Sequence, residues 1–258
     1  MTKILLSGCL GRMGRAVTEA AMAHPDRFTI VGGVDIGASA GAVLPFPVYT
    51  SLLQIPEGSE RPDVIVDFSH HAALPALLEY GTRHYLPLVI ATTGHTEEEH
   101  AAMTAAAQHT AIFFSRNMSL GINLLIMLCR KAAAVLGEDF DVEIIEKHHN
   151  KKLDAPSGTA LMLADAIREE FPDGKDYVFD RSQVRKARDT REIGIHAIRG
   201  GTIVGEHDVL FAGKDEQITL AHSATSREVF ATGALKAAEF MVGKASGLYD
   251  MNALLSDL

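Results

Sequence analysis

The feature that most constrains this chain is a set of three glycines between a short apolar segment and a helical pattern. Ile4-Leu5-Leu6 is predicted as a strand, Gly8, Gly11 and Gly14 follow it, and a helix is predicted over 15–23. Glycine permits a tight turn and lets backbone N–H groups approach a pyrophosphate, and a helix N-terminus adds unpaired donors. The pattern predicts a dinucleotide-binding unit. A tight turn without a ligand is the alternative, because the first glycine is one place off the common G-x-G-x-x-G spacing.

An acidic residue stands where such a unit needs one. Asp35 ends a second predicted strand, Thr29–Val34, about 20 residues after the glycines, where a carboxylate can accept the ribose hydroxyls. Ile36 follows it, so a 2′-phosphate would meet no cation there and would be repelled by Asp35. We therefore expect a preference for NADH over NADPH. Arg12, within the loop, keeps NADPH use possible.

Short apolar runs alternate with helical patterns as far as residue 115. Further strands are predicted at 48–49, 64–68, 87–91 and 111–114, with helices at 72–82 and 97–109. This alternation predicts a parallel sheet covered on both faces. Ligands bind outside the carboxyl ends of such strands, so Thr92, Thr93 and Gly94, which follow the strand at 87–91, are expected to contact the nicotinamide half of a cofactor.

The pattern changes in the second half of the chain. A long apolar helix is predicted at 120–135, and we expect it to be too short and too polar at its ends to span a membrane. The other predicted elements are strands at 142–146, 194–199, 202–210 and 217–222 and helices at 158–170 and 228–241. Gly200-Gly201 is typical of a hairpin between the second and third of these strands. The stretch 171–191 reads as a loop with a basic segment, which is either solvated or attracts an anionic substrate.

Composition excludes several classes of protein. The formal net charge of −9 argues against a nucleic-acid partner, although a local basic site could still bind a small anion. Only two cysteines occur, so no disulfide framework is implied. The chain begins on a predicted strand without signal-peptide architecture, and we expect a cytoplasmic protein without a membrane partner.

The densest polar segment of the chain lies at 146–160. His148 and His149 can exchange protons near neutral pH, and Lys152 supplies a cation. Ser157-Gly158-Thr159 opens a helix whose N–H groups and hydroxyls can hold an anion. A proton donor beside a carboxylate seat is what reduction of a C=C or C=N bond in a small acid requires. The alternatives are a zinc site, a solvated run of lysines and a simple capped helix; since no further ligand stands at helical spacing, we expect no metal.

With these residues the sequence resembles the 4-hydroxy-tetrahydrodipicolinate reductases, also called dihydrodipicolinate reductases, of the diaminopimelate route to lysine. The resemblance runs nearly end to end. It rests on Gly8–Gly14, Val66–Ser69, Thr92–Gly94, Asn117–Asn123, Glu146–Ala160, Arg199–Gly201 with Val204–His207, and Gly247–Met251. It implies an α/β protein with a Rossmann-type, doubly wound parallel sheet at 1–118, to which 229–258 returns. It also implies a second α+β domain at 119–228, with an open mixed β-sheet, for substrate binding and assembly into a homotetramer.

The resemblance also implies roles for individual residues. His148 matches the proposed general acid and Lys152 a second catalytic cation, while His149, Gly158 and Thr159 match the contacts to the substrate carboxylate. Ser157, at the same helix start, is also expected to bind the substrate. The implied cofactor shell comprises Gly8, Gly11, Arg12, Met13, Asp35, Ala91, Thr92, Thr93, Gly94, Ser115, Asn117 and Met118. This chain departs from the family at Ala91, where glycine is usual, at Asp35-Ile36, where some members have Glu-Arg, and at Met118, where Phe is common.

The implied reaction is reduction of a cyclic imine that carries two carboxylates. 4-Hydroxy-tetrahydrodipicolinate would be reduced, via dihydrodipicolinate, to tetrahydrodipicolinate with NADH, or with NADPH. Because cofactor and substrate are assigned to different domains, closure about hinges near 117–119 and 227–230 is expected. The alternatives are another NAD(P)H-dependent imine or amino-acid dehydrogenase and a non-catalytic NADH-sensing regulator.

Overall fold

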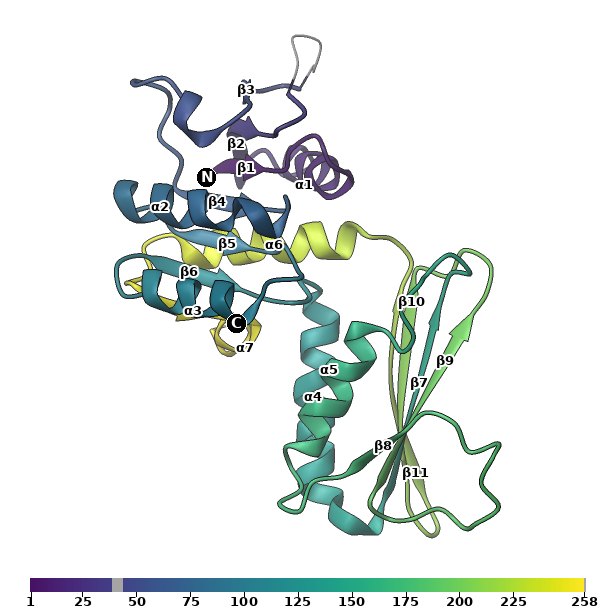
Figure 1. Cartoon of the computed structure of the whole chain (residues 1–258). Coiled ribbons are helices and arrows are strands. Elements are labelled where there is room, and N and C mark those ends of the chain that lie inside the picture. The colour runs from purple at the N-terminus through teal and green to yellow at the C-terminus, as the bar shows by residue number, and fades with distance from the viewer. Residues whose placement is uncertain (39–43, 258) are drawn as a thin grey trace. The chain divides into compact units, whose positions relative to one another are not determined.

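The computed structural model describes residues 1–38 and 44–257 and divides the chain into two compact units (Figure 1). Unit 1 comprises Met1–Leu120 and Arg227–Leu258, and unit 2 comprises Gly121–Ser226. The expected domain boundaries were 118/119 and 228/229, and those of the units are 120/121 and 226/227. The roles expected for the two domains remain predictions.

Unit 1 is built on a seven-stranded parallel sheet in the order β12-β6-β5-β4-β1-β2-β3. Its strands are β1 (Thr2–Ser7), β2 (Phe28–Val34), β3 (Val48–Tyr49), β4 (Val64–Asp67), β5 (Leu88–Ile90), β6 (Ala111–Phe114) and β12 (Gly247–Tyr249). The chain runs outward from β1 through β2 to β3, then returns to the other side of β1 with β4. The strand order thus reverses at β1, so the loop after β1 lies where ligands bind in sheets of this kind.

Helices cover both faces of this sheet, as the sequence predicts. The helices of unit 1 are α1 (Arg12–Met22), α2 (Leu74–His84), α3 (Glu97–Ala106), α6 (Glu228–Met241) and α7 (Met251–Ser256), with 3-10 turns at Leu52–Gln54 and His71–Ala73. Ile4 and Leu6 of β1 pack in the same core cluster as residues of α1, α6 and α7, whereas Leu5 packs with α2 and α3. Because successive side chains of a strand point to opposite faces, a continuous apolar run is required when both faces are buried.

Unit 2 contains a five-stranded mixed sheet in the order β11-β10-β7-β9-β8. Its elements are α4 (Leu120–Leu136), a 3-10 turn (Gly137–Asp139), β7 (Asp141–His148), α5 (Gly158–Arg168), β8 (Asp176–Val178), β9 (Glu192–Arg199), β10 (Gly205–Ala212) and β11 (Gln217–Ala224). Figure 1 shows α4 and α5 side by side against one face of this sheet, and Val142 and Ile144 of β7 pack there with Leu125 and Cys129 of α4. Glu146 and His148 follow at the same period of two, so they share this helix-covered face.

The prediction of a hairpin at Gly200-Gly201 is wrong. β7 lies between β9 and β10: it pairs with β9 in parallel and with β10 antiparallel. The glycine turn instead carries the chain past the end of β7, where Gly200 N–H donates to the carbonyl of His148 at 2.9 Å. A strand from elsewhere in the chain has been inserted between the two neighbours, which local turn chemistry does not reveal.

Other differences from the expected elements are smaller. β7 continues two residues further than expected, so His148 ends a strand and does not lie in a loop. The short strands β8 and β12 were not expected, because three residues are too few to show an alternating pattern. α1 begins at Arg12, three residues earlier than expected, directly after Gly11.

The apolar helix of unit 2 is longer than the sequence suggests. Within the described residues, Leu120–Asp139 is the one helical stretch long and apolar enough to cross a membrane, so the expectation that it is too short and too polar is wrong by length and composition. A core helix of a soluble protein meets the same criterion. α4 directs Leu125, Cys129 and Ala133 into the core of unit 2, whereas Leu124, Leu128 and Val135 are exposed.

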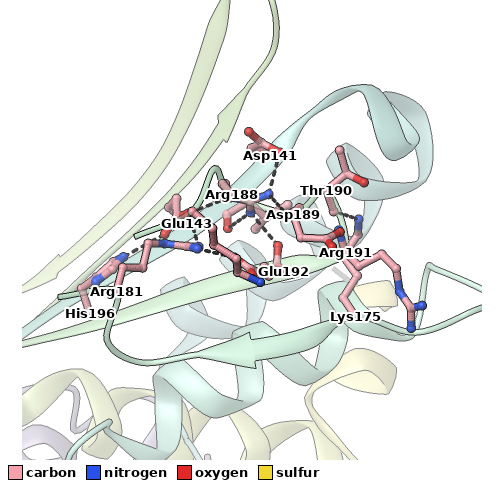
Figure 2. A network of polar contacts seen from close by, with 12 residues as sticks. Asp141, Glu143, Lys175, Arg181, Arg188, Asp189, Thr190, Arg191, Glu192 and His196 are labelled. Atoms are coloured by element: carbon pink, nitrogen blue, oxygen red, sulfur yellow. Dashed lines mark hydrogen bonds and ion pairs between the residues drawn. The ribbon is translucent and has the colours of Figure 1, made fainter. Parts of the chain in front are cut away.

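A network of charged side chains fixes the loop 179–191 to the open face of the sheet of unit 2 (Figure 2). Arg188 contacts Asp141 at 2.6 Å and Glu143 at 2.9 Å, and also donates to the carbonyl of Val142. Arg181 pairs with Glu143 and with Glu192. Lys186 also lies 3.5 Å from Glu192. Three cations of this basic segment therefore pair with carboxylates of their own unit, and neither interpretation of the loop predicted this.

Glu143 is the shared acceptor of this network. Its second oxygen lies 2.8 Å from His196 Nε2. Burial alone would raise the pKa of Glu143, but hydrogen bonds from His196 and Arg188 and the charge of Arg181 bring it below its ordinary value. Glu143 therefore stays ionised and holds the loop at neutral pH.

We expect Arg188→Ala to lower the free energy of unfolding by about 1–3 kcal/mol, because two carboxylates and a buried carbonyl lose their donor. Urea denaturation measures this change. Arg185→Ala, in the exposed part of the same loop, is the matched control and should change stability by less than about 0.5 kcal/mol. Equal effects of the two substitutions would contradict a structural role for Arg188.

Candidate active site

The glycine loop of unit 1 is shaped by two close backbone approaches. Gly8 has φ +77°, and a Cβ there would lie 2.5 Å from the carbonyl oxygen of Phe68. A Cβ on Gly14 would lie 2.2 Å from the carbonyl oxygen of Gly8. Gly11 is the N-cap of α1, and Arg12 and Met13 form its first turn, where backbone N–H groups have no helical acceptor. The loop therefore offers the donors that an anionic diphosphate needs.

Asp35 follows β2 and faces this loop. Its carboxylate accepts from Leu10 N–H at 3.0 Å and from Gly37 N–H at 2.9 Å. Each carboxylate oxygen can accept a second hydrogen bond, so the group remains able to bind hydroxyls. Ile36 beside it is 95% exposed and presents an open apolar side chain at the same place.

Asp67 connects the turns after β4 and β5. It is buried at the end of β4, and its Oδ2 accepts from the Thr92 hydroxyl at 2.6 Å. Its Oδ1 accepts from the hydroxyl and the N–H of Ser69. Asp67 thereby holds the turn Ala91–Gly94, in which Ala91 and Thr92 are buried and Thr93 and Gly94 are exposed.

The turn after β6 is also closely packed. The Ser115 hydroxyl donates to the carbonyl of Asn117 at 2.8 Å, and Ser119 N–H donates to Asn117 Oδ1 at 2.9 Å. Gly233 of α6 admits the carbonyl of Met118, which would lie 1.7 Å from a Cβ there. The residues expected around the cofactor thus follow β1, β2, β5 and β6, and these strands end at one edge of the sheet because they are parallel.

The centre of the polar cluster in unit 2 is the fully buried carboxylate of Glu146. Arg199 on the neighbouring strand β9 binds it with both terminal nitrogens, at 2.7 and 2.8 Å. Ser157 N–H donates to Oε1 at 3.0 Å, and His148 Nδ1 lies 2.6 Å from Oε2. One carboxylate therefore joins β7, β9 and the start of α5.

Ser157 is the N-cap of α5, as the sequence predicts. Its hydroxyl accepts from Ala160 N–H at 3.1 Å and also lies 3.1 Å from Nε2 of His207 on β10. Gly158 and Thr159 form the first turn, with Gly158 exposed and Thr159 partly exposed. The N-terminus of an eleven-residue helix thus begins beside the Glu146 cluster.

Lys152 and His149 lie in the loop between β7 and α5. The Lys152 ammonium is 2.9 Å from Asp154 Oδ1. His149 is partly exposed, while its Nδ1 is buried without a hydrogen-bond partner in the described residues. Asn150 N–H donates to the carbonyl of Gly201, which joins this loop to the glycine turn after β9.

Burial keeps the two imidazoles of this cluster from ionising easily. It lowers the pKa of His148 below its usual value, and this outweighs the opposite effect of Glu146, with Lys152 and Arg199 lowering it further. Burial lowers the pKa of His207 to about 4, with the neighbouring His148 adding to the effect. Despite burial, hydrogen bonds from Arg199 and His148 lower the pKa of Glu146. The cluster is one fixed anion beside neutral imidazoles near pH 7.

Sequence reasoning assigned no role to several residues of these sites. Glu146 could have been found, since it precedes His148 by two places on a strand and must share its face. Arg199 and His207 come from other strands, and their positions depend on sheet order and register. No group of three or more His, Cys, Asp or Glu in the described part of the chain is placed to hold a metal.

Comparison with known proteins identifies the family. The model of the dihydrodipicolinate reductase N-terminus matches residues 2–118, and that of the dihydrodipicolinate reductase C-terminus matches residues 121–255. The chain belongs to the dihydrodipicolinate reductase family. The 4-hydroxy-tetrahydrodipicolinate reductase of Caldanaerobacter subterraneus subsp. tengcongensis is 51% identical over 255 residues, which cover 99% of this chain and 98% of that protein. That of Akkermansia muciniphila is 42% identical over 260 residues, with the same coverage.

A solved structure agrees with this family assignment. Dipicolinate-bound dihydrodipicolinate reductase from Paenisporosarcina sp. TG-14 matches with a TM-score of 0.82 and 26% identity, over 98% of this chain and 99% of that chain. A C. glutamicum DAP dehydrogenase in complex with DAP is similar in fold alone, with a TM-score of 0.57 and 17% identity. The predicted fold class, a Rossmann-type parallel sheet plus a second domain with a mixed sheet, is confirmed.

We expect Asp67→Asn to weaken NADH binding by about three- to tenfold, because the turn at Thr92 loses an ionised acceptor while the shape of the side chain is kept. Quenching or enhancement of NADH fluorescence on titration measures the dissociation constant. Asp63→Asn, at the opposite end of β4, where Asp63 accepts from Lys3 N–H, is the control and should leave NADH binding unchanged. Unchanged binding in Asp67→Asn would remove this role.

Proposed function

We propose that this protein is a 4-hydroxy-tetrahydrodipicolinate reductase. It reduces its substrate, via dihydrodipicolinate, to tetrahydrodipicolinate with NAD(P)H, in diaminopimelate and lysine biosynthesis. The observation that carries the proposal is the cluster in unit 2, where His148, held by Glu146, lies on the same short segment as Lys152 and the N-cap of α5. This cluster stands in a chain that belongs throughout its length to the dihydrodipicolinate reductase family. No observation favours another dehydrogenase or a non-catalytic sensor.

Unit 1 has the features needed to hold the dinucleotide. A side chain on Gly8 or Gly14 would clash with neighbouring backbone atoms, and the first turn of α1 offers N–H donors beside them. We assign Gly8, Gly11, Arg12 and Met13 to the diphosphate. We assign Asp35 to the adenine ribose, and Ala91, Thr92, Thr93, Gly94, Ser115, Asn117 and Met118 to the nicotinamide half. When bound, the cofactor supplies a hydride.

Unit 2 supplies the proton and the charge that hold the substrate. In our proposal Lys152, His149 and the start of α5 at Ser157, Gly158 and Thr159 bind a carboxylate of the small cyclic substrate. His148 donates the proton that compensates the hydride, because Glu146 binds its Nδ1 and leaves Nε2 for the substrate. The cations and helix N–H groups also stabilise the negative charge that develops during reduction.

We also propose a preference for NADH, a homotetrameric assembly and a cytoplasmic location. The NADH preference rests on Asp35, whose carboxylate would repel a 2′-phosphate, and on the neutral Ile36 next to it. The tetramer is proposed to form through the face of the sheet in unit 2 that α4 and α5 leave uncovered. As proposed, the protein is a soluble enzyme in which α4 is a core helix.

The proposed activity predicts NADH oxidation, followed by absorbance, when freshly generated substrate is added. We expect His148→Gln to lower kcat by about 100-fold with little change in KM, since the side chain contributes mainly to proton transfer. Lys152→Ala should lower kcat and raise KM, because the ammonium also holds the substrate. Lys151→Ala, an exposed neighbour, is the control and should retain activity. Near-normal kcat in His148→Gln would remove His148 as the proton donor.

Cofactor preference is tested by the ratio of kcat/KM for NADH to that for NADPH, which we expect to exceed one. Asp35→Asn should raise kcat/KM for NADPH by about tenfold, because the repelling charge is removed while an acceptor for the loop N–H groups is kept. Glu57→Gln, an exposed acid elsewhere in unit 1, should leave the ratio unchanged. A strong NADPH preference in the unmodified enzyme would contradict the assignment of Asp35.

A further inference from the structure

The hydrogen bonds of Glu146 determine where the protons of its neighbours lie. A carboxylate accepts at about four lone-pair positions, and Glu146 has four partners: two nitrogens of Arg199, Ser157 N–H and His148 Nδ1. The Arg199 guanidinium and the Ser157 N–H can only donate. Glu146 is therefore ionised and saturated, and Nδ1 of His148 must carry the hydrogen. A neutral His148 then has a bare lone pair on Nε2, the atom left for the substrate.

The charges around His148 balance only when it is neutral. From β9, Arg199 offsets Glu146 of β7, and in the following loop Asp154 offsets Lys152. From β10, His207 lies edge-to-face with His148 at 5.3 Å between ring centroids, and it is too buried to carry charge near neutral pH. A proton on Nε2 would add an uncompensated positive charge to a side chain that is itself buried.

We propose that Glu146 is a positioning residue that makes protonation of His148 part of substrate binding. In the free enzyme His148 is neutral and donates Nδ1–H to Glu146; when the dianionic substrate binds, Nε2 takes one proton from solvent. Two added negative charges shift the balance of the cluster, and the imidazolium gains the Glu146 carboxylate as a partner at 2.6 Å. The inference rests on the proposed function, because that function supplies the dianion.

The protons balance over one turnover. Substrate binding brings one proton from solvent to Nε2 of His148. Reduction then adds the hydride of the cofactor and this proton across the unsaturated bond, which leaves oxidised cofactor and a neutral His148 with its Nδ1–H still on Glu146. No other proton donor is required for the reduction. The direction of the His148 pKa in the free site, below its usual value, agrees with the first of these states.

Calorimetric titration with pyridine-2,6-dicarboxylate, a dianion that is not reduced, tests the proposal in the presence of NADH. At pH 8, the binding enthalpy measured in buffers of different ionisation enthalpy should reveal an uptake of about one proton per site. As the pH is raised above the pKa of free His148, the affinity for the dicarboxylate should also fall by up to about tenfold per pH unit. Binding without proton uptake would overturn the proposal.

Substitutions assign the proton to its residue. In His148→Gln the dicarboxylate should still bind while uptake disappears; persistent uptake would show that another group takes the proton. In Glu146→Gln we expect uptake to be lost and kcat to fall at least about tenfold, with dicarboxylate affinity kept, because Arg199 becomes an unpaired cation. A merely structural role would instead weaken binding. Glu146→Asp, which keeps the charge, should recover part of the uptake, and it replaces the Gln variant if that protein does not fold.

A control and a second readout complete the experiment. Glu206 pairs with Lys147, on the face of the sheet opposite to the Glu146 cluster. Glu206→Gln should therefore leave proton uptake and kcat unchanged. Turnover measured in parallel separates the two proposals. Normal turnover with no uptake on binding overturns the role given to Glu146 alone, whereas absence of both turnover and dicarboxylate binding overturns the proposed function together with it.

Discussion

A buried carboxylate needs hydrogen-bond donors, and the donors that Glu146 requires hold the strands and the helix of its site in unit 2 together. Its four partners come from β7, from β9 and from the first residue before α5, so the pairing of two strands and the start of a helix meet at one group. If any of these elements were displaced, an ionised carboxylate would remain buried without full compensation, which is strongly unfavourable. The same bonds give His148 its tautomer and orientation. Structure and chemistry in this unit therefore depend on a single anion.

Carboxylates have a related part in unit 1, although there they organise turns and not strands. Asp35 accepts from the glycine loop, and Asp67 holds the turn that contains Thr92. Asp67 is the last residue of β4 and Asp35 directly follows β2, and each accepts a backbone N–H of a turn at this edge of the sheet. These turns at the edge of the sheet proposed to bind the cofactor are thus hydrogen-bonded without a ligand, which reduces the conformational entropy lost on binding.

The sequence predicts much of this fold because its local signals are strong. β6 and α6 were expected with the bounds that the structure shows, and Ser157 was expected as a helix cap. Local signals could not predict which strands pair with each other. Gly200-Gly201 has the chemistry of a hairpin, yet β7 occupies the place beside β9 where β10 would lie. For the same reason the segment 146–160 pointed to His148 and Lys152, while Arg199 and His207, which reach this segment through register, had no assigned role.

The central position of β7 has a consequence for how the protein acquires activity during folding. Its partners on both sides, β9 and β10, are made more than 40 residues later in the chain, so both pairings close long loops. Pairings of this kind form slowly compared with helices and local turns. A nascent or partly folded chain can therefore have a complete β7–α5 segment and still lack Arg199 and His207 beside it. We therefore expect the acid–base group to be completed late in folding, so that the onset of activity reports completion of the sheet.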